Sequence, residues 1–205
     1  FGIRIYIFYI FINDYDADGS TDDVERVDAL MSIGSTLKTT ISASLALYSE
    51  VSLLNFTETT DSGMNSGDLR FATYNFVGGL GMSEATTGMF PIPSFNEKRG
   101  DILLNGDGYN GLYYNIYNNS SQLFDGSYQK ATIIHEIGHT MGLSHPHGSS
   151  INSYEANENF GRPLTVMSYS DYNGDAINGY NWNQAPHTLM IVDILALQAM
   201  YGTNW

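Results

Sequence analysis

One short stretch of the sequence carries side chains at the spacing that a hydrolytic metal site needs. His135 and His139 are four residues apart, so on a helix both imidazoles point to one face and can share an ion. Gly142 can end that helix with a positive φ, and the chain can then turn back and deliver His145 as a third nitrogen. Three imidazole ligands leave a fourth position open for water, as in catalytic zinc sites. We therefore predict one zinc ion held by these three histidines.

Glu136 directly follows the first of these histidines and lies beside the same face of the helix. Its carboxylate can reach a zinc-bound water without being a ligand itself. It would accept the proton of that water, the hydroxide would attack a carbonyl carbon, and the proton would pass to the leaving amine. Four of the five histidines lie between His135 and His147, which argues against a chance coincidence of spacing. His147 itself is interpreted as a surface residue.

The composition excludes several classes of partner and of site. Eight Lys and Arg against 22 Asp and Glu give a net charge of −14, which repels nucleic acid and anionic lipid. With no cysteine the chain has no disulfide and no thiolate ligand, so a metal must be held by histidine and carboxylate. The longest apolar run, 1–12, is too short to span a membrane, and no small-residue cleavage site follows it. We expect no nucleic acid, no membrane association, a monomer, and a mature fragment of the chain.

Three stretches have the apolar spacing and the end signals of helices. Ser127 is a predicted N-cap, Gly202 is a predicted glycine stop, and Gly34 separates the first helix from an earlier, shorter one. Asp193 falls inside the last helix, where a buried carboxylate needs hydrogen-bond donors. The predicted helices are 39–51, 127–141 and 189–201.

Short runs rich in β-branched and aromatic residues, separated by Gly, Asn, Ser and Asp, predict the strands of one sheet. Pro91 and Pro93 cannot donate hydrogen bonds to a neighbouring strand, so the run 89–94 belongs at a sheet edge if it is a strand. Such an edge can accept an extended peptide. The predicted strands are 1–12, 53–57, 68–76, 87–92 and 101–105.

An acidic loop near the start of the chain matches the pattern of a calcium-binding loop in part. Thr21 stands where an aliphatic residue is usual, and the preceding flank reads as strand rather than helix. The loop is therefore either a Ca²⁺ site or a solvated acidic linker. The residues at loop positions 1, 3, 5, 6, 7, 9 and 12 are Asp14, Asp16, Asp18, Gly19, Ser20, Asp22 and Glu25.

The text HEIGHTMGLSHPH, from His135 to His147, resembles the extended zinc motif of the metzincin metalloproteases, and it is most similar to the serralysin branch because Pro146 follows the third histidine. The text TVMSY around Met167 resembles the Met-turn of that family. The resemblance implies that Met167 forms a hydrophobic floor beneath the zinc. It also implies that Tyr169 is a catalytic residue, which can ligate the resting zinc and then steady the oxyanion.

Weaker resemblance covers most of the chain after about Thr39. It implies an α+β, metzincin (zincin-like) fold with a twisted, mostly parallel five-stranded sheet, long helices and a small C-terminal lobe. We expect 1–205 to be a single catalytic domain, with an N-terminal lobe over about 1–145 and a C-terminal lobe over about 146–205. The calcium-binding β-roll that usually follows in serralysins has no counterpart in the sequence.

Taken together, these features predict a zinc metalloendopeptidase that hydrolyses peptide bonds in extended polypeptide substrates and is secreted, extracellular and bacterial. Two other functions remain open. A peptide-binding module without activity would bind but not cleave, and it would not need Glu136 together with all three ligands. A metal-dependent hydrolase acting on another substrate class would not need a peptide-binding edge strand. His187 is interpreted as structural.

Overall fold

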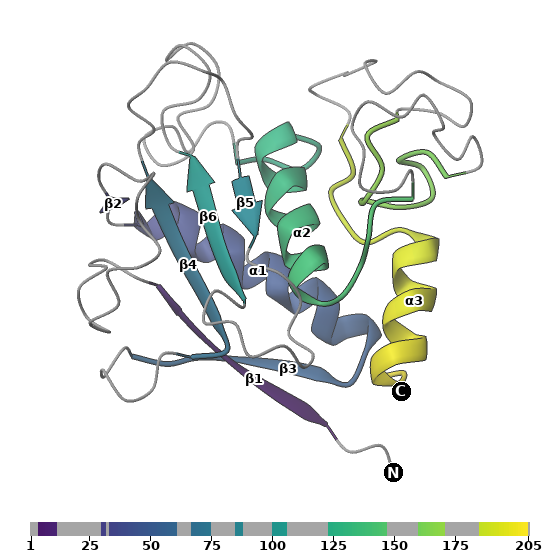
Figure 1. The fold of residues 1–205 in the computed structure, drawn as a ribbon, viewed down its shortest axis with the longest axis horizontal. Helices are drawn as coiled ribbons and strands as arrows, with labels where there is room; N and C mark the ends of the chain where they lie inside the picture. Colours follow the sequence, from purple (N-terminus) through teal and green to yellow (C-terminus); the bar gives the residue numbers. More distant parts are fainter. Residues whose placement is uncertain are drawn as a thin grey trace.

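The described strands form one mixed sheet (Figure 1). The computed structural model describes residues 4–11, 30–31, 33–60, 67–74, 85–87, 100–105, 123–146, 160–170 and 185–204. The strand order is β3-β1-β4-β6-β5, with the short β2 paired to β4 beside this path. The strands are β1 (Ile5–Phe11), β2 (Leu30–Met31), β3 (Leu54–Glu58), β4 (Leu69–Tyr74), β5 (Ala85–Thr87) and β6 (Asp101–Asn105).

The sheet is mostly parallel, as predicted. β1 pairs in parallel with β3 and β4, and β4 pairs in parallel with β6. β5 and β2 are antiparallel to their neighbours. The described strands number six rather than the predicted five, because the two-residue β2 adds to the five of the main path. The predicted strand 87–92 lies only partly within the described residues, where β5 occupies Ala85–Thr87; the run 89–94 lies outside them.

The described residues contain three helices: α1 (Ser35–Val51), α2 (Tyr128–Thr140) and α3 (Ile191–Tyr201). α1 begins four residues before its predicted start, directly after Gly34. Hydroxyls at Thr39 and Thr40 donate to the carbonyls four residues earlier, so these β-branched residues are accommodated within the helix. The predicted shorter helix before Gly34 is wrong at residues 30–31, which form β2; residues 12–29 lie outside the described part.

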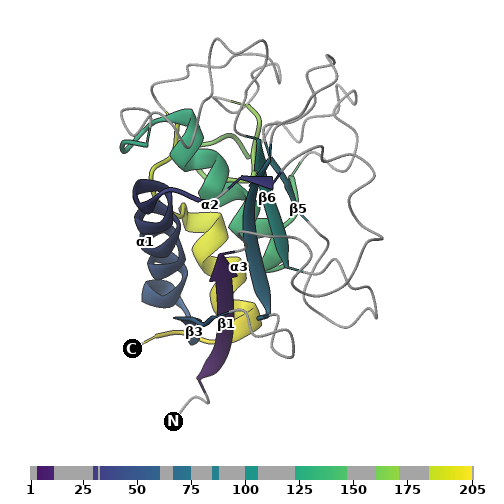
Figure 2. The ribbon, with the colours of Figure 1, turned by 90° about the vertical axis from the view of Figure 1, so that its left-hand side faces the viewer.

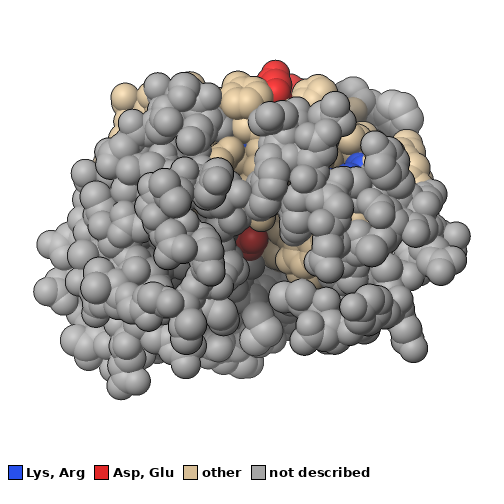
Figure 3. All heavy atoms as spheres, turned by 90° about the horizontal axis from the view of Figure 1, so that it is seen from above, with Lys and Arg blue, Asp and Glu red and all other residues tan. Residues whose placement is uncertain are grey.

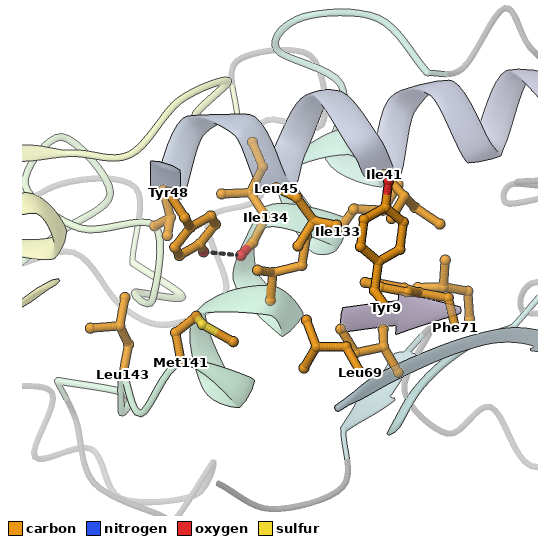
Figure 4. Packing of buried hydrophobic residues seen from close by; sticks show 14 of the residues in the cluster. Tyr9, Ile41, Leu45, Tyr48, Leu69, Phe71, Ile133, Ile134, Met141 and Leu143 are labelled. Atoms are coloured by element: carbon orange, nitrogen blue, oxygen red, sulfur yellow. Dashed lines mark hydrogen bonds between the residues drawn. The ribbon is translucent and has the colours of Figure 1, made fainter. Parts of the chain in front are cut away.

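α1 and α2 cover the same face of the sheet, as the view turned by 90° shows (Figure 2). Their buried side chains interdigitate with those of the strands, and Figure 4 shows Ile41 and Leu45 of α1 above Ile133 of α2 and Phe71 of β4. At about 25 cal/mol per Å² of apolar surface removed from water, this shared core is the main term that stabilises the helix–sheet arrangement. α2 is thereby packed against both α1 and the sheet.

α3 fastens the end of the described chain to the other two helices. The Tyr201 hydroxyl donates to the carbonyl of Met141 at 2.8 Å, and the Gln198 amide donates to the carbonyl of Val51 at 3.1 Å. Gly202 ends α3 with a φ of 80°, which confirms the predicted glycine stop. Among the helices of the described residues, none combines the length and the apolar character needed to cross a membrane.

Candidate metal centre

Helix α2 carries two of the three predicted ligands and begins at a defined cap. The Ser127 hydroxyl accepts a hydrogen bond from the Lys130 amide at 3.2 Å, which pairs one of the N–H groups left open in the first turn. The apolar face of α2 is fully buried and fixes the rotation of the helix. His135 and His139 lie together one turn apart, with ring centroids 4.7 Å from each other.

The turn after α2 delivers the third histidine, and it needs glycine. Gly142 has a φ of 90°, its amide donates to the His139 carbonyl at 3.0 Å, and the Leu143 amide donates to the Gly138 carbonyl at 2.9 Å. These two bonds and the left-handed residue form a Schellman motif, which ends the helix and reverses the chain. The predicted role of Gly142 is confirmed, and His145 follows within reach of the helix.

The three histidines meet at their Nε2 atoms. His145 Nε2 lies 3.0 Å from His135 Nε2 and 2.9 Å from His139 Nε2. The other ring nitrogen of two of these histidines contacts a backbone carbonyl. His135 Nδ1 lies 2.9 Å from the Val166 oxygen, and His139 Nδ1 lies 2.9 Å from the Leu143 oxygen. Because a carbonyl can only accept, each of these Nδ1 atoms carries the proton, and the lone pair of the neutral ring is on Nε2.

This arrangement fits a metal ion. Two acceptor lone pairs converge on His145 Nε2, which can donate at most one hydrogen to them, so hydrogen bonding within the trio cannot satisfy all three nitrogens. A cation can accept all three lone pairs. In a tetrahedral zinc site with bonds of 2.0–2.1 Å, the nitrogens lie roughly 3.3 Å apart, close to the distances observed. Each of the three residues offers one ligand atom within 4.8 Å of the others.

The surroundings keep the rings in the form that a metal binds. Burial, followed by the nearby His139 ring, lowers the pKa of His135 to about 3, against the opposing hydrogen bond to Val166. Burial also lowers the pKa of His139 below its usual value. Metal ligation requires neutral imidazole, so neither of these rings has to lose a proton near pH 7.

A buried carboxylate on α3 organises the backbone that receives His135. Asp193 is 1% exposed, and its oxygens accept hydrogen bonds from the Thr165 hydroxyl at 2.5 Å and from the Val166 and Met190 amides, each at 2.9 Å. The Met167 amide donates in turn to the Thr165 hydroxyl at 3.1 Å. The expectation that Asp193 accepts hydrogen bonds in the core is confirmed, and these bonds hold the segment that carries the Val166 carbonyl.

Met167 packs directly against α2 at Gly138. A Cβ atom at Gly138 would lie 2.7 Å from Met167 Sδ and 3.2 Å from the hydroxyl of Tyr48. The buried Tyr48 hydroxyl donates to the Ile134 carbonyl at 2.6 Å. The absence of a side chain at Gly138 therefore lets the helix, the methionine and the tyrosine approach each other directly before His139 and three residues after His135.

The two predicted catalytic side chains lie in the same region. The Tyr169 ring stacks on His135, with centroids 5.5 Å apart and planes 18° apart, and it lies 4.6 Å from the His145 ring. Glu136 is 9% exposed on α2, next to His135. Seen from above, an acidic side chain is visible near the centre of the view (Figure 3).

The remaining predictions concern His187, His147 and the acidic loop 14–25. His187 is exposed and is not among the three histidines that could hold a metal ion, and its structural role stays a prediction. His147 and the acidic loop 14–25, including its candidate calcium ligands, lie outside the described residues.

Three residues that contact the site or its supporting segments carry no spacing signal of that role in the sequence: Tyr48, Gly138 and Arg162. Tyr48 bonds to Ile134 and Gly138 lies against Met167, so no local spacing rule could have found these two. Arg162 bonds to Ser168 and Ser170 within its own loop, where no periodic pattern marks such a contact. Gly138 within a helix, where glycine costs about 1 kcal/mol relative to alanine, is the one available signal of a close approach.

No family model matches the chain, but comparison with known proteins finds serralysins and a metallopeptidase among its relatives. A serralysin of Photorhabdus sp. (strain Az29) is 28% identical over 188 residues, covering 82% of this chain and 33% of that protein. A serralysin of Proteus mirabilis is 36% identical over 113 residues, covering 49% and 21%. The metallopeptidase AprA of Pseudomonas marginalis is 25% identical over 219 residues, covering 98% and 41%.

The identities are low, and the chain spans about a third of the length of the first of these relatives. The described residues nevertheless form an α+β fold with a small, mostly parallel sheet and a cluster of three histidines that can hold a metal ion. In sequence, this α+β chain with its histidine trio is similar to metalloproteases named serralysin and AprA.

Proposed function

We propose that this chain is the catalytic part of a zinc-dependent endopeptidase of the serralysin type, with the metzincin fold. The observation that carries the proposal is the convergence of three imidazole Nε2 atoms, two of which belong to rings oriented by backbone carbonyls. A structural core of satisfied histidines would not bring their lone pairs together. Similarity to proteins named as metalloproteases supports the same function.

In this function His135, His139 and His145 hold the zinc ion, which when bound supplies Lewis-acid activation of water and of the scissile carbonyl group. Glu136 acts as general base: its carboxylate takes a proton from the attacking water and returns it to the leaving amine. Its nearly buried position next to His135 supports this role, because a carboxylate that is poorly solvated interacts strongly with the reacting groups.

Tyr169 serves as a second catalytic residue. Its ring lies against two of the three histidine rings, which supports a position from which the phenolic hydroxyl can donate to the oxyanion. Met167 supports the histidines from the side of α2, where Gly138 leaves it room.

Extended polypeptides are the proposed substrates. β5 is antiparallel to β6, stands at the end of the strand order and packs against α2. A substrate in extended conformation can add to such an edge through main-chain hydrogen bonds, which brings its peptide groups alongside the metal helix. We further propose that the protein is a monomeric, secreted bacterial enzyme, with residues 1–205 forming one catalytic domain of two lobes.

The decisive experiment measures casein cleavage and bound zinc for the parent protein, for Glu136→Gln and for Glu50→Gln. Glu50 is exposed on α1 and is the matched control. We expect activity that a chelator removes and zinc restores. Loss of a general base should lower kcat at least ~100-fold without loss of zinc, while the control keeps its activity. Full activity of Glu136→Gln would refute the mechanism, and cleavage that resists the chelator would refute the metal.

A further inference from the structure

A buried arginine forms hydrogen bonds to the backbone on both sides of Tyr169. Arg162 is 8% exposed; its side-chain Nε donates to the Ser168 carbonyl at 3.3 Å, and its amide donates to the Ser170 carbonyl at 2.9 Å. These two carbonyls belong to the residues immediately before and after Tyr169. The bonds close the segment 162–170 into a loop and fix the direction in which the Tyr169 side chain leaves it.

A guanidinium at this place is costly, which suggests a specific use. Removing a charged group from water is unfavourable unless its hydrogen bonds are replaced, and an apolar side chain would fill the same space at lower cost. Lysine would keep the charge but not the planar Nε donor, because its ammonium is a point charge at the end of a flexible stem. The group of Arg162 that bonds to the segment is the side-chain Nε–H, which has a fixed direction in the planar guanidinium.

The other end of the same segment has a separate anchor. Asp193 binds Thr165 and Val166, and the Val166 carbonyl contacts His135. Arg162 binds the carbonyls at 168 and 170, which flank the ring that stacks on His135. One anchor therefore serves a predicted zinc ligand, and the other serves the predicted catalytic tyrosine.

We propose that Arg162 is a positioning residue for Tyr169: it holds the phenol against the histidine trio without contacting the substrate. This inference rests on the proposed function for its catalytic consequence, although the placement of Tyr169 can be measured without activity. Loss of the Arg162 side-chain bond should displace the phenol while leaving the three histidines in place. A displacement of order 1 Å in a reacting group costs up to ~100-fold in rate.

The experiment uses full-length protein with 3-fluorotyrosine in place of tyrosine. The ¹⁹F resonance of Tyr169 is assigned by its loss in Tyr169→Phe. Arg162→Lys and Arg162→Gln are compared with Ile41→Val, which alters a fully buried side chain on α1. Bound zinc, kcat and KM are measured for each variant and for Arg162→Lys combined with Tyr169→Phe.

We expect both Arg162 variants to bind zinc like the parent, to shift or broaden the Tyr169 resonance, and to lower kcat by about 10- to 100-fold with KM nearly unchanged. In the Tyr169→Phe background, Arg162→Lys should have no further effect on kcat. Ile41→Val should leave the resonance and kcat unchanged.

An unchanged Tyr169 resonance in both variants would overturn the proposal. So would a loss of zinc that accompanies the shift, because Arg162 would then act on the whole segment, and so would unfolding of both variants, because the role would then be general stability. If the parent shows no metal-dependent proteolysis, the proposed function fails; the resonance and the zinc content still decide whether Arg162 positions Tyr169.

Discussion

The phenolic hydroxyl of Tyr48 in α1 donates a hydrogen bond of 2.6 Å to the backbone carbonyl of Ile134 in α2 (Figure 4). Ile134 directly precedes His135, and Tyr48 is fully buried. The bond therefore joins the longest helix of the described residues to the turn of α2 that carries the first histidine. A polar group at this depth is tolerated only because it is paired.

Tyr48→Phe should lower the free energy of unfolding by about 1–3 kcal/mol, because the Ile134 carbonyl loses a hydrogen-bond donor at a buried position where water cannot easily take its place. Tyr9→Phe is the matched control, since the Tyr9 hydroxyl contacts the partly buried Ser42 hydroxyl. Urea denaturation of both variants provides the comparison. A smaller cost for Tyr48→Phe than for Tyr9→Phe would contradict the importance of the bond between the helices.

The same tyrosine should make the protein sensitive to alkali. Burial, followed by the nearby charges of Asp193 and Glu136, raises the pKa of Tyr48 well above its usual value of 10.0. The unfolded chain releases this proton first, so the contribution of Tyr48 to stability is complete below about pH 10 and is lost as the pH rises from there towards the folded pKa.

Between about pH 9 and pH 11, the unfolding free energy of the parent should thus decline more steeply than that of Tyr48→Phe, by at most ~1.4 kcal/mol per pH unit. Urea denaturation at several pH values gives both slopes. Parallel slopes for the two proteins would show that Tyr48 titrates alike in the folded and unfolded states.

Gly138→Ala should destabilise the protein although alanine favours helices by about 1 kcal/mol over glycine. The new Cβ would lie 2.7 Å from Met167 Sδ, and Met167 is buried and cannot move aside freely. Overpacking of this kind typically costs about 1–3 kcal/mol. Thermal unfolding of the variant, alone and combined with Met167→Ala, measures the clash; the substitution should cost less when the sulfur is absent. A net gain in stability for Gly138→Ala alone would show that the contact yields easily.

Asp193→Asn should weaken zinc binding although the residue touches no histidine. The asparagine amide presents hydrogens where the carboxylate accepts three donors, so the segment that carries the Val166 carbonyl loses part of its support. Outer groups that orient a ligand typically contribute about 10- to 100-fold in affinity, and we expect the lower end. Competition with a chromophoric chelator gives the affinity, and Asp125→Asn, on an exposed residue, is the control. Equal affinities in the two variants would mean that His135 keeps its orientation without this network.

Zinc should stabilise the parent strongly and His145→Ala weakly. At a zinc concentration about 1,000 times the dissociation constant, binding adds about 4 kcal/mol to the unfolding free energy. His145→Ala removes one of the three converging nitrogens, whereas His187→Ala changes only an exposed ring. Thermal unfolding with and without zinc measures the stabilisation by zinc in the parent and in both variants. If His145→Ala gains as much as the parent, the third nitrogen is not a ligand.

The chemistry of the α2 region could be predicted from the sequence because it depends on contacts within a few residues. Helical periodicity places His135 and His139 together. Ser127 begins the helix through a local hydrogen bond, and Gly142 ends it with a positive φ. The stop at Gly202 follows the same local rule. These features need no knowledge of where the helix lies in the molecule.

What supports the site was decided only by the tertiary structure. Tyr48 and Ile134 are 86 residues apart, Thr165 and Asp193 are 28 apart, and Arg162 reaches across its own loop to flank Tyr169. A single buried tyrosine or aspartate belongs to no periodic pattern from which its hydrogen-bond partner could be predicted. The partner is set by how α1, α2 and α3 pack, since a buried polar group must bond to whatever the assembled core brings within reach.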